Sequence, residues 1–418
     1  RGVEIHAYDS LSFRQSESRP PVDWRDYSAS FYSTLRSAVQ RELVSDVPVG
    51  VLLSGGLDSS TIAALMVDLY PGKVESFTIG FEEGSFDESQ HARKVAQYLN
   101  TQHNEMILTS KKAVELVGEI SSFLDEPFAD SSIIPTYLLS RFARQKVKVV
   151  LGGDGGDELL AGYPTILSHR LIGYYERLVP WALRAYVAPR VMDNLKVSFD
   201  NISLDFRLRR FLAGRGVPLI TRHQRWLGSF VDEEKAVLLR NWVKPVLRDT
   251  YYQSYEYARV CDAKEPLNQI LFNDLKTYLE GDILYKVDRA SMAASLEVRV
   301  PFLNREVVRF ANNLPLGLKL HNLTGKFLLK KMMRGRLPDD IIHRSKKGFN
   351  MPVAYWLSGD LKEIVTDMLS PSFVNRQNLF DHTYIQELTN EHFQQRKDNR
   401  KLLWTLLMFQ LWYSKYIE

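Results

Sequence analysis

The chain has 418 residues, of which 45% are hydrophobic and 25% are charged, values that are ordinary for a folded soluble protein. Its 54 basic and 50 acidic residues nearly balance, so the overall charge gives no argument for a nucleic-acid or membrane partner, and neither is expected. The single cysteine, Cys261, excludes an internal disulfide and is typical of a reducing compartment, and no run of 18 or more apolar residues predicts a transmembrane helix. We therefore expect a cytoplasmic protein.

The N-terminal third shows two kinds of segment. Residues 1–26 are polar, with Ser, Arg and Pro clusters, and are predicted to be a linker. Residues 27–163 alternate short apolar runs with amphipathic stretches, which predicts a nucleotide-binding α/β core. The predicted strands are 47–54, 73–81, 103–108 and 147–153, and the predicted helices are 27–43, 59–70, 87–99, 111–124 and 131–145. Such repeated strand–helix units predict a parallel sheet with helices on both faces, which binds ligands at the carboxyl ends of its strands.

The rest of the chain is predicted to be helical. Residues 164–275, rich in Arg, Leu, Tyr and Trp, are predicted to form a helical insertion. Its arginines favour a solvated helix surface with aromatic packing, and nucleic-acid binding is the alternative. Residues 276–418 are predicted to be mainly helical and to complete the site, ending in the apolar helix 401–417.

The motif SGGLDSS, residues 54–60, follows a predicted buried strand and begins a predicted helix. Its glycines allow a tight turn close to a ligand, and its hydroxyls and the free N–H groups of the helix start favour a phosphate chain. Asp58 would repel phosphate unless a cation lay between them, so we assign it to Mg²⁺. A Gly-Ser loop at an ordinary helix N-cap is the competing interpretation.

A second motif, LGGDGGDELLAGY at residues 151–163, also follows a predicted strand. Asp157 could complete a Mg²⁺ site with Asp58, since Mg²⁺ usually binds one or two carboxylates together with substrate phosphates. Asp154 could face the reacting centre. Alone, this motif is as typical of a turn or a calcium-like loop as of a catalytic site. Its position on the same predicted sheet as SGGLDSS favours the catalytic site.

Two further motifs carry charges. The segment 284–304, LYKVDRASMAASLEVRVPFLN, combines apolar residues with Lys286, Asp288, Arg289, Glu297 and Arg299. The competing interpretation of this segment is a helix whose charges pair with each other. The segment 344–352, RSKKGFNMP, places Lys346 and Lys347 before a glycine in a predicted loop, where lysines are more often simply solvated.

The four motifs, in this order, resemble the synthetase domain of the glutamine-hydrolysing asparagine synthetases, from about residue 30 to the C-terminus. SGGLDSS alone is shared by the wider ATP-pyrophosphatase group, and the later motifs, with DEPFADSS at 125–132, narrow the resemblance. It implies an adenine-nucleotide-hydrolase-like α/β fold that binds ATP and Mg²⁺. The implied ATP-binding residues are Leu52, Ser54, Gly55, Gly56, Asp58, Ser59, Ser60, Ile79 and Gly153; the implied Mg²⁺ ligands are Asp58 and Asp157; and the implied catalytic residues are Lys346, on the adenylation transition state, and Asp154, where some members have Glu.

The resemblance implies an AMP-forming carbon–nitrogen ligase that activates a carboxylate as an acyl-adenylate and amidates it with ammonia. L-Aspartate is the implied small-molecule substrate, and the implied products are L-asparagine and pyrophosphate. The alternatives are a sugar carboxylate, a peptide carboxylate, a β-lactam-synthetase-like cyclisation and, outside the enzymes, a nucleotide-binding regulatory protein. The family's N-terminal glutaminase domain has no counterpart in this sequence, so ammonia is expected to be free or to come from a separate glutaminase. A homodimer stays open.

Overall fold

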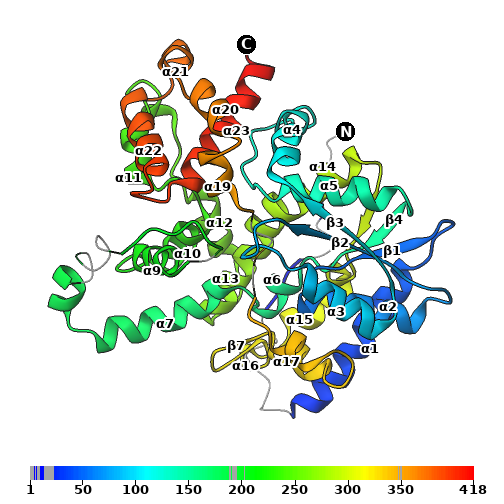
Figure 1. Cartoon of the computed structure of the whole chain (residues 1–418). Coiled ribbons are helices and arrows are strands. Elements are labelled where there is room, and N and C mark those ends of the chain that lie inside the picture. The colour runs from blue at the N-terminus through cyan, green and yellow to red at the C-terminus, as the bar shows by residue number, and fades with distance from the viewer. Residues whose placement is uncertain are drawn as a thin grey trace.

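A computed structural model describes residues 4, 6, 10–13, 23–187, 190, 195–201, 203–346, 348 and 351–418. Within these residues the centre of the protein is one five-stranded sheet with the strand order β3-β2-β1-β4-β5, all neighbours being parallel (Figure 1). The strands are β1 Val49–Leu52, β2 Glu75–Phe81, β3 Gln102–Leu108, β4 Val149–Leu151 and β5 Glu297–Arg299.

Side chains alternate between the two faces of the sheet because successive residues of a strand point in opposite directions. Val51 and Leu151 lie in one hydrophobic core cluster, whereas Phe77, Ile79 and Val150 lie in the other. Helices cover both faces, as the repeated strand–helix units require. The helices of the N-terminal part are α1 Trp24–Glu42, α2 Leu57–Leu69, α3 Ser89–Leu99, α4 Ser110–Ser121, α5 Ile133–Arg144 and α6 Gly156–Leu160.

The described residues between 164 and 275, where we predicted a helical insertion, are mainly helical. Its helices are α7 Pro164–Leu178, η2 Leu183–Val187, α9 Leu204–Ala213, α10 Leu219–Leu227, α11 Asp232–Leu238, η3 Lys244–Val246, α12 Tyr252–Val260 and α13 Pro266–Asp274. A ten-residue π-helix, η4 Leu275–Leu284, continues α13 directly into α14 Tyr285–Ala293. This continuous helical run crosses the boundary that we predicted between residues 275 and 276.

The C-terminal part is mainly helical, and its one small sheet is the antiparallel pair β6 Leu320–His321 and β7 Thr324–Gly325. Its remaining helices are η5 Pro301–Leu303, α15 Arg305–Asn312, α16 Leu316–Lys319, α17 Phe327–Met332, α18 Asp339–His343, α19 Val353–Ser358, α20 Lys362–Met368, α21 Pro371–Gln377, α22 His382–Phe393 and α23 Arg400–Tyr416. The predicted fold class, an α/β parallel sheet covered on both faces with a helical insertion and a mainly helical C-terminal part, is confirmed.

Most of the predicted linker, residues 1–26, lies outside the described residues. Phe13, however, is fully buried, its backbone N–H donates to Asp262 at 2.8 Å, and its ring meets that of Phe272 edge-on at 6.2 Å. This residue therefore belongs to the core, and the division into parts remains a prediction. Among the described residues, no helix combines the length and the apolar character that a bilayer span requires.

Candidate active site

The loop after β1 turns sharply into α2. Gly55 has φ +69°, and a Cβ there would lie 2.5 Å from the backbone nitrogen of Ala92 on α3, so only glycine fits this turn. The hydroxyl oxygens of Ser54 and Ser59 lie 3.0 Å apart, which ties the start of the loop to the first turn of the helix. The loop thus presents hydroxyls and the free N–H groups of a 13-residue helix at one point, an arrangement that favours an anion.

The loop after β4 packs tightly against this first loop, because β4 is the neighbour of β1 in the sheet. A Cβ at Gly153 would lie 2.7 Å from the backbone nitrogen of Ser59, and a Cβ at Gly156 would lie 2.7 Å from the Asp58 carboxylate. The close approach brings Asp58 and Asp157, both largely buried, to the same place.

Two lysines from the C-terminal part reach these carboxylates. The Lys326 ammonium forms ion pairs with Asp58 and, at 2.5 Å, with Asp157. The Lys346 ammonium lies 2.7 Å from the other oxygen of Asp157. We define Asp58, Asp157, Lys326 and Lys346 as the phosphate-side cluster.

The sequence analysis missed Lys326. Lys326 directly follows the β6–β7 hairpin and is the N-cap residue of α17, with φ +53°. Its backbone N–H donates to the carbonyl oxygen of Leu160 at 3.0 Å, which fixes its position. A Cβ at the preceding Gly325 would lie 2.4 Å from the carbonyl oxygen of Ala161. In the sequence, only the Thr-Gly-Lys triplet at the end of the hairpin could have pointed to Lys326. The hairpin itself could not be predicted, because a two-residue strand is too short to be recognised by periodicity.

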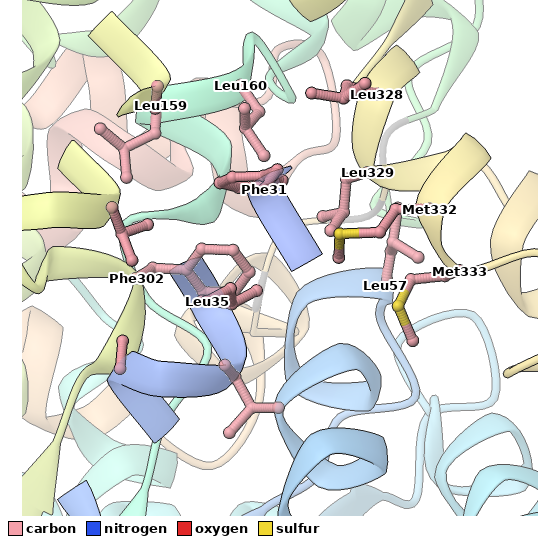
Figure 2. Packing of buried hydrophobic residues seen from close by; sticks show 14 of the residues in the cluster. Phe31, Leu35, Leu57, Leu159, Leu160, Phe302, Leu328, Leu329, Met332 and Met333 are labelled. Carbon is pink, nitrogen blue, oxygen red and sulfur yellow. The ribbon is translucent and has the colours of Figure 1, made fainter. Parts of the chain in front are cut away.

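Apolar neighbours hold the charged side chains in position. Leu57 precedes Asp58, Leu159 and Leu160 follow Asp157, and Leu328 and Leu329 follow Lys326. Figure 2 shows these five leucines gathered with Phe31, Leu35, Phe302, Met332 and Met333 in one core cluster. The segments that carry Asp58, Asp157 and Lys326 are therefore fixed by their own buried side chains within two or three residues of the charge.

The charges of the cluster set each other's protonation. Burial raises the pKa of Asp58, and the nearby Lys326 does not fully offset this effect. Burial acts on Asp157 in the same direction, but Lys326 and Lys346 outweigh it and hold the pKa of Asp157 at about 2. Burial alone would lower the pKa of Lys346, whereas Asp157 and Asp58 raise it above its ordinary value. The paired carboxylate of Asp157 thus remains ionised at neutral pH.

A second ionic cluster includes residues of segments 125–132 and 284–304, which the sequence analysis singled out without assigning a site role to Asp130 or Lys286. The Lys286 ammonium lies 2.8 Å from both Asp130 and the Ser132 hydroxyl. Although burial would raise it, the pKa of Asp130 is lowered to about 2 by Lys286, whereas burial and the neighbouring Asp130 raise the pKa of Asp282 to about 8. We define Asp130, Asp282 and Lys286 as the acceptor-side cluster; Asp282 lies in the π-helix η4, a conformation that often occurs at functional sites.

Asp154 lies close enough to both clusters to respond to both. Burial raises its pKa, and Lys286 and Lys346, one from each cluster, act in the opposite direction. The adjacent Glu158 is 1% exposed, accepts a hydrogen bond from the Tyr163 hydroxyl at 2.7 Å, and has its pKa raised to about 8, first by burial and then by Asp157.

The remaining predicted residues lie on the sheet or beneath the loop. Leu52 ends β1 and Ile79 lies within β2, both contacting the second core cluster. Ser60 is fully buried and its hydroxyl has no hydrogen-bond partner among the described residues, so it lies behind the loop rather than on its open side. Lys347 lies outside the described residues.

The carboxylates fit a magnesium ion that also binds substrate phosphates. One oxygen of Asp58 is buried without a hydrogen-bond partner among the described residues. In that part of the chain no group of three or more His, Cys, Asp or Glu side chains is placed to hold a metal by itself. A pair of carboxylates is what Mg²⁺ uses when phosphates supply its other ligands.

The fold and these clusters define an α/β protein in which a Gly-Ser loop, the N-terminus of α2 and a pair of carboxylates meet at the carboxyl edge of the sheet. The sequence pattern of the family described as asparagine synthase matches residues 30–414. The chain therefore belongs to the asparagine synthase family.

Three relatives illustrate the range of similarity. The glutamine-hydrolyzing asparagine synthetase 1 of Bacillus subtilis (strain 168) is 30% identical over 91% of this chain and 58% of its own length. A putative glutamine-hydrolyzing asparagine synthetase of Mycobacterium tuberculosis (strain ATCC 25618 / H37Rv) is 34% identical over 92% of this chain and 57% of its own length. The amidase chry2 of Gibberella zeae is 23% identical over 94% of this chain and 62% of its own length. The chain thus spans less than two thirds of the length of these relatives.

Proposed function

We propose that the chain is an ATP-dependent, amide-forming synthetase that activates a carboxylate as an acyl-adenylate and transfers the acyl group to ammonia. The observation that supports this most is the phosphate-side cluster, in which two lysines and two carboxylates meet beside the N-terminus of α2. Fixed cations beside free helix N–H groups stabilise a polyphosphate, and paired carboxylates suit its accompanying cation.

The phosphates of ATP lie, in this proposal, along the loop formed by Ser54, Gly55, Gly56 and Ser59. Asp58 and Asp157 would hold Mg²⁺, which supplies neutralising charge to the phosphates. Leu52 and Ile79 border the adenine, and Gly153 leaves room for the two loops to close. Ser60 acts from behind the loop, because its side chain is fully buried.

The first step forms the adenylate. An oxygen of the substrate carboxylate bonds to the α-phosphorus, the bond from that phosphorus to the bridging oxygen breaks, and pyrophosphate leaves with the electron pair. Negative charge grows on the bridging oxygen, and the fixed ammonium groups of Lys326 and Lys346 stabilise it without having to reorient.

The second step forms the amide. The nitrogen of ammonia bonds to the acyl carbon, a proton leaves that nitrogen, and the bond from the acyl carbon to the AMP oxygen breaks. Asp154 is the proton acceptor in this proposal, because a lysine of each cluster acts on its carboxylate and burial raises its pKa toward the range in which a carboxylate can take up a proton.

In this proposal the acceptor-side cluster binds the acceptor, which is the carboxylic acid that becomes amidated. Lys286 can attract a second carboxylate of the substrate acid. The partly protonated Asp282 can accept a hydrogen bond from an amine of the substrate or donate one to it. L-Aspartate carries both groups and is the first candidate. A sugar carboxylate, a peptide carboxylate or a β-amino acid cyclised by its own amine follows next, since relatives named amidases match nearly the whole chain.

The test is a product analysis with ATP, Mg²⁺, ammonium and a panel of carboxylic acids. The proposal expects one acid to give equal amounts of AMP, pyrophosphate and amide. Replacing ammonium by glutamine should give product only if a glutaminase activity is present. Formation of ADP and phosphate, or ATP turnover that no acid stimulates, would rule the proposal out, and the second result would favour a regulatory nucleotide-binding protein.

A further inference from the structure

An exposed apolar surface covers the outer side of α7 and the segment that follows it. Leu171, Tyr174 and Leu178 recur at spacings of three and four residues, so they share one side of the helix, and their exposed fractions rise to 78% at Leu178. The opposite side of α7 is buried through Ile166, His169 and Ile172. The exposed side is therefore not turned toward the core of the protein.

The same surface continues past the end of the helix. Trp181, Leu183 and Tyr186 are 66%, 49% and 56% exposed, and the rings of Trp181 and Tyr186 meet edge-on at 5.7 Å. Together with the three residues of α7 we define these six side chains as the α7 surface. Figure 1 shows α7 extending away from the sheet and the rest of the body, so this surface lies at the rim of the molecule. A grouping of large apolar side chains at such a place is typical of an interaction site.

Positive charges outnumber negative charges in the segment that carries the α7 surface. Residues 164–215 contain nine Lys or Arg and four Asp or Glu, although the whole chain is nearly balanced. Between Arg170 and Arg190 the only carboxylate is Glu176, which accepts the Gly216 N–H at 3.1 Å and lies 3.7 Å from Arg222 on α10. That carboxylate is therefore engaged by neighbouring segments of the protein, whereas Arg177, on the flank of the exposed side of α7, is exposed.

Independently of the proposed function, we propose that the α7 surface binds the surface of an anionic lipid bilayer. Leucine side chains can enter the boundary between headgroups and acyl chains, Trp and Tyr prefer the headgroup level, and arginines attract lipid phosphates. A second copy of this chain fits less well, because a symmetric contact would place the arginines of both copies opposite each other. A nucleic acid would satisfy the arginines but would leave the exposed leucines without apolar partners.

Vesicle flotation tests the proposal with phosphatidylcholine vesicles that contain or lack phosphatidylglycerol. We expect the chain to float with phosphatidylglycerol vesicles, and binding to fall at least about tenfold when phosphatidylglycerol is omitted or when the double variant Leu178→Glu/Trp181→Glu is used. The matched control is Val44→Glu/Val246→Glu, which adds the same charge at valines that are 77% and 76% exposed elsewhere on the molecule. The control should bind like the unchanged chain.

Three results would overturn the proposal. They are failure of the unchanged chain to bind phosphatidylglycerol vesicles, equal binding by the Leu178→Glu/Trp181→Glu variant, and equal loss of binding in the control. Sedimentation velocity of the free proteins detects the rival occupant. If the unchanged chain self-associates without binding vesicles and the Leu178→Glu/Trp181→Glu variant does not self-associate, the α7 surface is a contact between copies instead. All four substituted side chains are well exposed, so both double variants should unfold at the same temperature as the unchanged chain. This thermal unfolding measurement shows that the variants are folded.

Discussion

The side-chain nitrogen of Lys346 lies 2.7 Å from a carboxylate oxygen of Asp157. This ion pair joins the segment after α18 to the first turn of α6, which follows the loop after β4. Two residues earlier, Arg344 donates to the carbonyl oxygen of Gly55 at 3.2 Å, so the same segment also contacts the loop after β1. The proposed catalytic cation, a proposed Mg²⁺ ligand and the phosphate loop are thereby held as one unit.

Lys346→Met should slow adenylation by about 10²–10³ while changing the apparent affinity for ATP little, because the ammonium acts on charge that develops in the transition state. Asp157 keeps its ion pair with Lys326 at 2.5 Å, so the site should stay folded. The measurement is ATP–pyrophosphate exchange as a function of ATP concentration. Lys94→Met, which breaks an exposed ion pair with Asp340, is the matched control and should leave the exchange rate unchanged. A loss confined to ATP affinity would show that Lys346 binds the ground state.

Asp58→Asn should lower Mg²⁺-dependent turnover by about 10²–10³, because an amide keeps the shape of the side chain but loses the charge that attracts the cation. Lys326 retains its pairing with Asp157, so the protein should remain folded. Turnover is followed across a Mg²⁺ titration. Asp68→Asn, an exposed position on the same helix, should behave like the unchanged chain. Full turnover in Asp58→Asn would refute the assignment of this carboxylate to the metal.

Gly153→Ala should weaken ATP binding and slow adenylation, because the added Cβ would lie 2.7 Å from the Ser59 backbone nitrogen and push the two loops apart. Gly118→Ala offers the contrast, since a Cβ there meets nothing within 4 Å and lies inside α4. That control should keep full activity and gain about 0.5–1 kcal/mol of stability from helix propensity. Both variants are compared by ATP titration and by urea unfolding. Equal activities in the two variants would contradict the tight loop contact.

Glu158→Gln should flatten the pH dependence of stability. The pKa of Glu158 is raised from 4.5 to about 8, so between these values the folded protein holds a proton that the unfolded chain has lost. The free energy of unfolding therefore falls as pH rises through this window, by up to about 1 kcal/mol per pH unit, and a neutral Gln removes this contribution. Gln can still accept the Tyr163 hydrogen bond. Urea unfolding at several pH values between 5 and 8 measures both slopes, and parallel slopes would show that Glu158 ionises normally.

Sequence periodicity predicted the elements that are long enough to repeat a pattern. The apolar runs of β1 to β4 and the helices between them appear where expected, within a few residues. β5 was missed because three residues, Glu297–Arg299, cannot show an alternation and carry two charges. Its pairing with β4 is a tertiary contact, which decides strand formation where local propensity does not.

The two loop motifs of the site could be predicted because their chemistry is concentrated in a few consecutive residues. The structure brings Asp58 and Asp157 together because β1 and β4 are neighbours, a relationship that the chain order alone does not reveal. Lys326 was missed for the opposite reason, because it is a single lysine in an otherwise ordinary segment. Lys286 lies in a motif that was recognised, but no role could be assigned to it, because the partners of both lysines are carboxylates that lie far away in the sequence.

The acyl-adenylate is the central claim, and an isotope transfer tests it most directly. The acid that supports product formation is labelled with ¹⁸O in its carboxylate and incubated with ATP, Mg²⁺ and ammonium. If the carboxylate attacks the α-phosphorus, one labelled oxygen per turnover must appear in AMP and none in pyrophosphate. Label in inorganic phosphate with formation of ADP, or unlabelled AMP, would contradict the account.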